Sequence, residues 1–205
     1  MAERSKKAGT RQHLMQTAIN LYARHGLDGV SLRQIGAAAG AKNSAAMHYH
    51  FTDKLGLLDA SVAYIRDQLA QVEVALAQPQ PSNLELLVEA EVMVWAHMTV
   101  VPDWGQSAVK LVSRLLLEFD TDIRQILNHH LGSRAVRFRG HLQELFPSAS
   151  AKQVAVRSLL ALDSIVHGTA EVDVITAAPF PDIGPLSLED TRPELIRYVV
   201  QGLRF

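Results

Sequence analysis

Apolar residues between positions 55 and 76 recur at alternating spacings of three and four, and this stripe constrains the fold more than any other feature. The spacing places the side chains on one face of a helix, so it predicts a long helix packed against a core. Elsewhere the apolar spacing is also helical, and no stretch shows sustained alternation of apolar and polar residues. The sequence therefore predicts an all-α fold of about nine helices. The stripe consists of Leu55, Leu58, Val62, Ile65, Leu69, Val72 and Leu76.

Capping residues, glycines and prolines mark where these helices begin and end. A first helix is expected from about residue 10 to Gly26, and Ser31 is expected to cap a short helix that ends at Gly40. Thr52 or Asp53 is placed to cap the long helix, which should end before Pro79. The remaining helices are expected over residues 43–50, 82 or 83 to 102, about 109–119, 121–146, 151–168 and after Pro193. The helix over 121–146 should be interrupted near Gly132, and residues 172–188 should form a loop.

Composition narrows the chemistry open to this chain of 205 residues. The sequence contains no cysteine, which excludes disulfide frameworks, thiolate zinc sites, iron–sulfur clusters and cysteine nucleophiles. No apolar run reaches the roughly 18 residues of a membrane span, and no apolar segment follows the basic residues near the N-terminus. We therefore expect a cytoplasmic protein without a membrane partner.

Charge is distributed unevenly along the chain. Residues 1–60 carry eight Lys and Arg against four Asp and Glu, a net charge of +4, whereas the remaining residues have a net charge of −5. A basic N-terminal part on an acidic body favours a polyanionic partner for the first part. The alternative is chance scatter in a nearly neutral protein.

Three short helices followed by a long one, inside this basic segment, outline a helix-turn-helix. Small apolar residues such as Ile35, Ala38 and Ala39 would let two helices cross closely, and Gly40 would permit the turn between them. The second helix of such a motif lies in the major groove of DNA. Spacing alone is also compatible with an ordinary pair of antiparallel helices.

The residues of this segment resemble the DNA-binding domain of TetR-family transcriptional regulators. Three blocks of residues carry the resemblance, in the order and near the spacing typical of the family. The sequence departs from the family pattern in two places: the stretch from Gly40 to Phe51 is one residue longer than in the commonest form, and Gly36 replaces the common alanine. The blocks are Ala18, Leu21, Tyr22 and Gly26; then Ser31, Leu32, Arg33, Ile35, Ala39 and Gly40; then Tyr49, His50, Phe51, Lys54 and Leu57.

The resemblance implies roles for individual residues. Arg33 resembles an arginine that reaches a guanine or a phosphate, and Thr10 and Ser31 resemble capping residues that meet phosphates. The residues expected to contact base edges are Lys42, Asn43, Ser44, Ala45 and His48, and those expected to contact phosphates are Tyr49, His50 and Lys54. For Tyr49 and His50 the alternative is packing against the first helix. Residues 1–56 would form this domain, with residues 1–9 as a flexible tail.

The resemblance also implies that residues 57–205 form a domain that binds a ligand and dimerises. Large residues expected around a pocket among the helices are Trp95, Met98, Trp104, Phe119 and His129, with ordinary core packing as the alternative. Residues expected at the dimer interface, unless they are simply buried inside one subunit, are Leu159, Leu162, Val166, Leu195 and Val199.

Basic and histidine side chains form two further groups in the body. The basic stripe Arg134, Arg137, Arg139 and His141 is expected to be a solvated face, and a site for an acidic ligand is the alternative. The histidines lack the spacing of a metal site, so no metal and no cofactor are expected.

The expected function follows from the resemblance. We expect a ligand-responsive transcriptional regulator, a repressor, that binds a palindromic double-stranded operator as a homodimer and responds to a small-molecule effector. The alternative is a helical enzyme that uses His97 with Glu91 in the body.

Overall fold

The computed structural model describes the chain over residues 2–40, 45–77, 80–100, 103–172 and 186–205, with side chains from residue 9 in the first range and from residue 47 in the second. These ranges hold nine helices and no strand, so the all-α prediction is confirmed. The helices are α1 (Ala2–His25), α2 (Leu32–Ala38), α3 (Ala45–His50), α4 (Lys54–Leu76), α5 (Leu84–Val100), α6 (Gly105–Leu116), α7 (Thr121–Leu145), α8 (Ala151–Ala170) and α10 (Leu188–Leu203).

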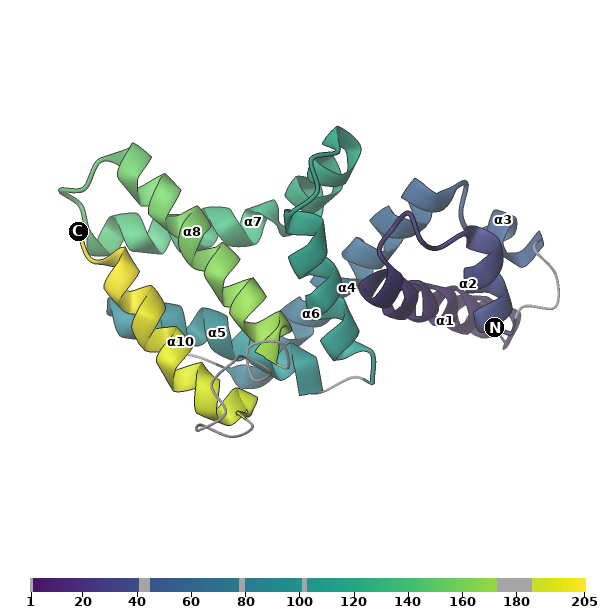
Figure 1. The fold of residues 1–205 in the computed structure, drawn as a ribbon, viewed down its shortest axis with the longest axis horizontal. Coiled ribbons are helices and arrows are strands. Elements are labelled where there is room, and N and C mark those ends of the chain that lie inside the picture. Colours follow the sequence, from purple (N-terminus) through teal and green to yellow (C-terminus); the bar gives the residue numbers. More distant parts are fainter. Residues whose placement is uncertain (1, 41–44, 78–79, 101–102, 173–185) are drawn as a thin grey trace.

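Helices α1 to α3 form a small unit at one end of the elongated molecule (Figure 1). Gly26 and Gly40 have φ of +74° and +69°. This left-handed conformation commonly follows the end of a helix, and glycine adopts it without steric strain because it has no Cβ. Ser31 caps α2: its hydroxyl accepts from the Gln34 backbone N–H, and the Gln34 side chain accepts from the Ser31 backbone N–H. The expected breaks of this unit are therefore confirmed.

Helix α4 connects the small unit to the body formed by α5, α6, α7, α8 and α10 (Figure 1). Asp53 is its N-cap and accepts a 2.7 Å hydrogen bond from the Gly56 backbone N–H. The middle of the predicted stripe faces the core, since Leu58, Val62, Ile65, Leu69 and Val72 are all buried. At its two ends Leu55 is exposed and Leu76 is half-buried, because the helix termini extend past the packed core. Helix α4 packs on α1 at one end and on α5 and α7 in the body, while α6 also packs on α1.

The helix boundaries differ from the sequence expectation in three places. Helix α1 begins at Ala2, so residues 2–9 of the expected flexible tail are helical, because Ala, Glu, Arg and Lys are good helix formers. Helix α7 runs unbroken through Gly132. Helix α10 begins before Pro193, because Ser187 and Asp190 form a capping box upstream of it.

None of the described helices combines the length and the apolar character that a membrane span requires.

Candidate nucleic-acid interface and ligand pocket

The face expected to bind DNA lies on the small unit, with α3 at the end far from the body (Figure 1). Ile35 and Met47 are buried between the helices, while Arg33 and His48 are exposed and Tyr49 is 67% exposed. Thr10 and Ser31 are also exposed, whereas His50 and Lys54 are half-buried. Lys42, Asn43 and Ser44 lie outside the described residues, and Ala45 begins α3.

Local contacts fix the orientation of the side chains at this face. The Tyr49 and His50 rings meet edge to face, with centroids 5.0 Å apart. Phe51 is buried, as expected, and the Arg11 guanidinium lies 5.3 Å from the centroid of its ring. Arg11 adds a basic group from α1 that the motif comparison had not included.

The body contains an apolar cavity of about 360 Å³ between α5, α6, α7 and α8. Its size falls in the range of small-molecule sites. Trp95, Leu127 and Leu131 line it together with the leucines of α8, and Glu91 and Arg134 contribute a polar edge.

Of the five residues expected around a pocket, only Trp95 lines this cavity. Met98 is fully buried core, and the Trp104 ring stacks on Tyr64 with centroids 4.8 Å apart. Phe119 is 88% exposed at the turn after α6, where it packs beneath Arg124, so its assignment to a pocket wall is wrong. His129 is exposed too and borders an open groove between α4 and α7.

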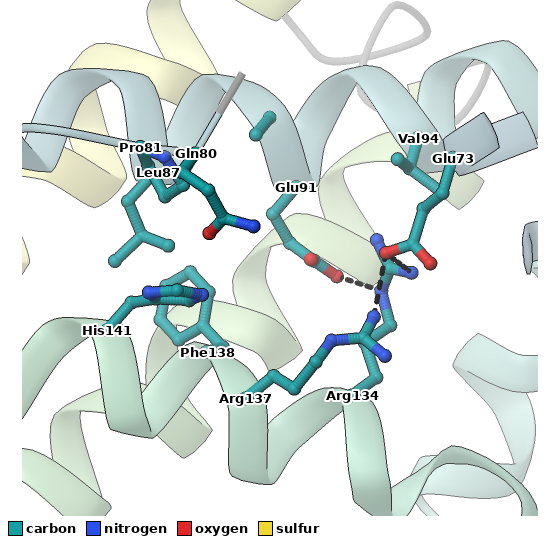
Figure 2. Close-up of a pocket in the computed structure, with 11 residues that line it drawn as sticks. Glu73, Gln80, Pro81, Leu87, Glu91, Val94, Arg134, Arg137, Phe138 and His141 are labelled. Carbon is teal, nitrogen blue, oxygen red and sulfur yellow. Dashed lines mark hydrogen bonds and ion pairs between the residues drawn. The ribbon is translucent and has the colours of Figure 1, made fainter. Parts of the chain in front are cut away.

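An ion-pair network joins α4, α5 and α7 (Figure 2), and its buried Glu91–Arg134 pair forms the polar edge of the apolar cavity. The Arg134 Nε donates to Glu91 Oε1 at 2.5 Å, and its Nη1 donates to Glu73 Oε1 at 2.8 Å. Arg137 donates to the same Glu73 oxygen at 2.8 Å, and Trp95 Nε1 donates to Glu91 Oε1 at 2.8 Å. Burial alone would lower the pKa of Arg134, but the carboxylates of Glu91 and Glu73 outweigh it and raise that pKa.

The network corrects the expectation of a wholly solvated basic stripe. The Arg134 side chain is only 10% exposed, because Glu73 and Glu91 reach it from helices that are distant in sequence. The network also commits Glu91 to Arg134 and Trp95, away from the pairing with His97 that the enzyme alternative requires.

A second polar link joins α4 to α7 near the small unit. The buried His130 ring bonds through Nε2 to Asp59 Oδ1 at 2.8 Å and through Nδ1 to Arg66 Nη1 at 3.2 Å. A guanidinium can only donate, so Nδ1 accepts and Nε2 carries the hydrogen that is donated to Asp59. In this arrangement the ring hydrogen of His130 lies on Nε2. In the part of the chain that the structure describes, no group of acidic and histidine side chains forms a metal site.

Residues expected at a dimer interface fall into two groups. Leu159 is 63% exposed and Leu162 half-buried, whereas Val166 and Val199 are buried inside the monomer. Leu195 packs closely on Gly168: a Cβ added to Gly168 would lie 2.8 Å from the Cδ1 atom of Leu195. The outward apolar side chains of these two helices, here called the α8/α10 apolar face, are Val156, Leu159, Leu160 and Tyr198.

Two family models match the sequence, one on each part of this architecture. Residues 14–61 match the family of bacterial regulatory proteins of the tetR type, and residues 92–202, more than half of the chain, match the C-terminal domain of tetracyclin repressor-like proteins. The chain belongs to the TetR family. It is thus a TetR-family transcriptional regulator with a helix-turn-helix domain.

Solved structures of TetR-type regulators share the fold over almost the whole chain. A protein from Rhodococcus sp. assigned to the TetR family superposes with a TM-score of 0.71 at 13% identity, covering 96% of this chain and 100% of that one. The fatty acid degradation regulator FadR from Bacillus halodurans gives 0.69 at 14% identity, covering 95% and 96%. FadR from Bacillus subtilis, in complex with stearoyl-CoA, gives 0.64 at 14% identity, covering 94% and 99%. No curated protein matches the sequence.

Proposed function

We propose that this TetR-family protein is a ligand-responsive repressor that binds a palindromic operator as a homodimer and changes its DNA affinity when a small molecule occupies the body. The observation that carries the proposal is the course of α4. It begins directly after the helix expected to read DNA and reaches Glu73 in the ion-pair network beside the cavity. In this role the protein works in the cytoplasm and catalyses no reaction.

The exposed residues of the small unit support DNA binding. Arg33, in the first turn of α2, has the guanidinium geometry that suits bidentate contact with guanine or a phosphate. His48 and Tyr49 are exposed on α3, which lies at the end of the molecule. A duplex can therefore approach α3 without meeting the body.

The α8/α10 apolar face supports a dimer. Large apolar side chains that stay exposed often mark a protein–protein interface, and Leu159, Leu160 and Tyr198 are each more than 60% exposed. A twofold pair through this face would carry two reading helices, which bind successive major grooves when they lie roughly 34–36 Å apart.

The apolar cavity supports an effector site in the body. An effector shifts DNA affinity when it binds one conformer of the protein more tightly than another. The stearoyl-CoA complex of Bacillus subtilis FadR, a protein of the same fold, supports a small-molecule effector for this chain.

Selection of preferred duplexes from a random pool, followed by fluorescence anisotropy at several salt concentrations, tests the proposal. We expect a palindromic consensus and an affinity that falls steeply with salt. Arg33→Ala should weaken binding of that duplex by about 1–3 kcal/mol, while Arg139→Ala, an exposed arginine of the body, should not. A folded protein that enriches no sequence from the pool contradicts the proposal.

A further inference from the structure

A second cavity of about 210 Å³ lies between α4, α5 and α7 (Figure 2) and is here called the polar cavity, because charged and polar side chains make up more of its lining than of the first. Arg137 and His141, four residues apart on one face of α7, line it, and the Gln80 amide projects toward its middle. Glu91 and Arg134 line both this cavity and the apolar one. The Glu91–Arg134 ion pair is therefore a shared wall with a polar space on one side and an apolar space on the other.

The polar cavity retains unused capacity to bind an anion. Arg137 is 56% exposed and uses one amino group on Glu73, so its other N–H groups point to no described acceptor. His141 adds an imidazole whose Nδ1 lies 3.6 Å from the exposed Glu144 carboxylate. Guanidinium groups bind carboxylate and phosphate oxygens through paired hydrogen bonds, so these side chains suit an acidic group.

Glu73 is the member of the network that an incoming anion can replace most easily. Its side chain is 36% exposed, against 9% for Glu91, so a released Glu73 carboxylate can turn into water. Displacing Glu91 would instead leave a carboxylate buried beside Trp95, which costs far more free energy.

We infer that the polar cavity binds the carboxylate or phosphate group of an amphipathic organic anion, whose acidic group takes the place of Glu73 on Arg134 and Arg137 and whose apolar part packs on Leu87, Val94 and Phe138 of the same cavity. The inference rests on the proposed function, because it names the chemical class of the effector. Occupancy releases the Glu73 carboxylate of α4 from Arg134 and Arg137 of α7.

Calorimetric titration of decanoate, decyl phosphate and decanol into the full chain tests the site, because the three probes share one apolar tail. We expect both anions to bind at least about tenfold more tightly than decanol, the difference typical of a charged hydrogen bond. Arg137→Gln should remove most of that preference, Arg137→Lys should restore part of it, and Glu73→Gln should tighten the binding of both anions. Arg139→Gln, an exposed arginine on the same helix that does not line the cavity, is the matched control.

The same variants, titrated onto the selected duplex, test whether the release of Glu73 is coupled to DNA affinity. Glu73→Gln should change DNA affinity in the same direction as decanoate changes that of the parent, and decanoate should then have a smaller effect on the variant. The inference is overturned if decanol binds as tightly as the anions, if none of the three probes binds, or if Arg137→Gln keeps the preference. Those results leave the proposed function standing as long as the parent protein still binds a specific duplex.

Discussion

Two tyrosines near the junction of the small unit and the body differ in how their hydroxyls are satisfied. The Tyr64 hydroxyl accepts hydrogen bonds from Gln12 and Gln16 of α1, at 2.8 and 3.0 Å. Tyr22 is fully buried, and its hydroxyl has no hydrogen-bond partner among the described residues. Burial raises the pKa of Tyr22 well above its ordinary value, so the ring stays neutral.

Replacing each tyrosine with phenylalanine should therefore give opposite results. Tyr22→Phe removes an unpaired buried hydroxyl, so the free energy of unfolding should stay the same or rise by up to about 1 kcal/mol. Tyr64→Phe breaks two hydrogen bonds and should lower it by about 1–2 kcal/mol. Urea denaturation of both variants measures the difference, and a larger loss in Tyr22→Phe than in Tyr64→Phe would contradict this account.

At the scale of helices, α10 depends on a charged capping residue. The Asp190 carboxylate accepts hydrogen bonds from the Ser187 hydroxyl at 2.7 Å and the Ser187 backbone N–H at 2.8 Å. These hydrogen bonds lower the pKa of Asp190 below its ordinary value. A carboxyl with a lowered pKa in the folded state stabilises that state above its ordinary pKa, and the contribution is lost as the pH falls through the lowered value.

Asp190→Asn should therefore be less stable than the parent at pH 7, with the difference shrinking below the ordinary aspartate pKa of 3.8. Urea denaturation of both proteins at neutral and at acidic pH measures this. Glu189→Gln, in the same turn but outside the capping box, is the control. A difference that persists undiminished in acid would show that the charge of Asp190 does not stabilise α10.

The local sequence was sufficient to predict the helices, but it did not predict which charged side chains would be buried or with which residues they would form ion pairs. The stripe of α4 and the caps at Ser31 and Asp53 depend on neighbours within one or two turns, so spacing was sufficient. Arg134 could not be assigned in this way, because its partners lie 43 and 61 residues earlier and only tertiary packing brings them together. For the same reason spacing alone did not separate the exposed Leu159 from the buried Val199.

At the scale of the whole molecule, substitutions at exposed and at buried residues of α10 should separate an effect on dimerisation from an effect on folding. Tyr198→Glu places a charge on a side chain that is 70% exposed, so the variant should remain folded but sediment as a monomer. Val199→Glu places a charge at a residue that is 2% exposed, so it should unfold the subunit instead.

Val136→Glu is the control, since Val136 is also 70% exposed but lies on α7. Analytical ultracentrifugation with circular dichroism separates the two effects. An unchanged sedimentation coefficient for Tyr198→Glu, in a parent that is dimeric, would remove Tyr198 from the interface.

Among the described residues, the main attachments of the small unit to the body are α4, which continues into it, and α6, which packs against α1. We expect the small unit to swivel as a rigid body about these attachments. In a twofold assembly the two swivels have the same magnitude and are related by symmetry. A small rotation near either attachment is therefore magnified at α3 and alters the gap between the paired α3 helices, which a duplex of fixed pitch cannot follow.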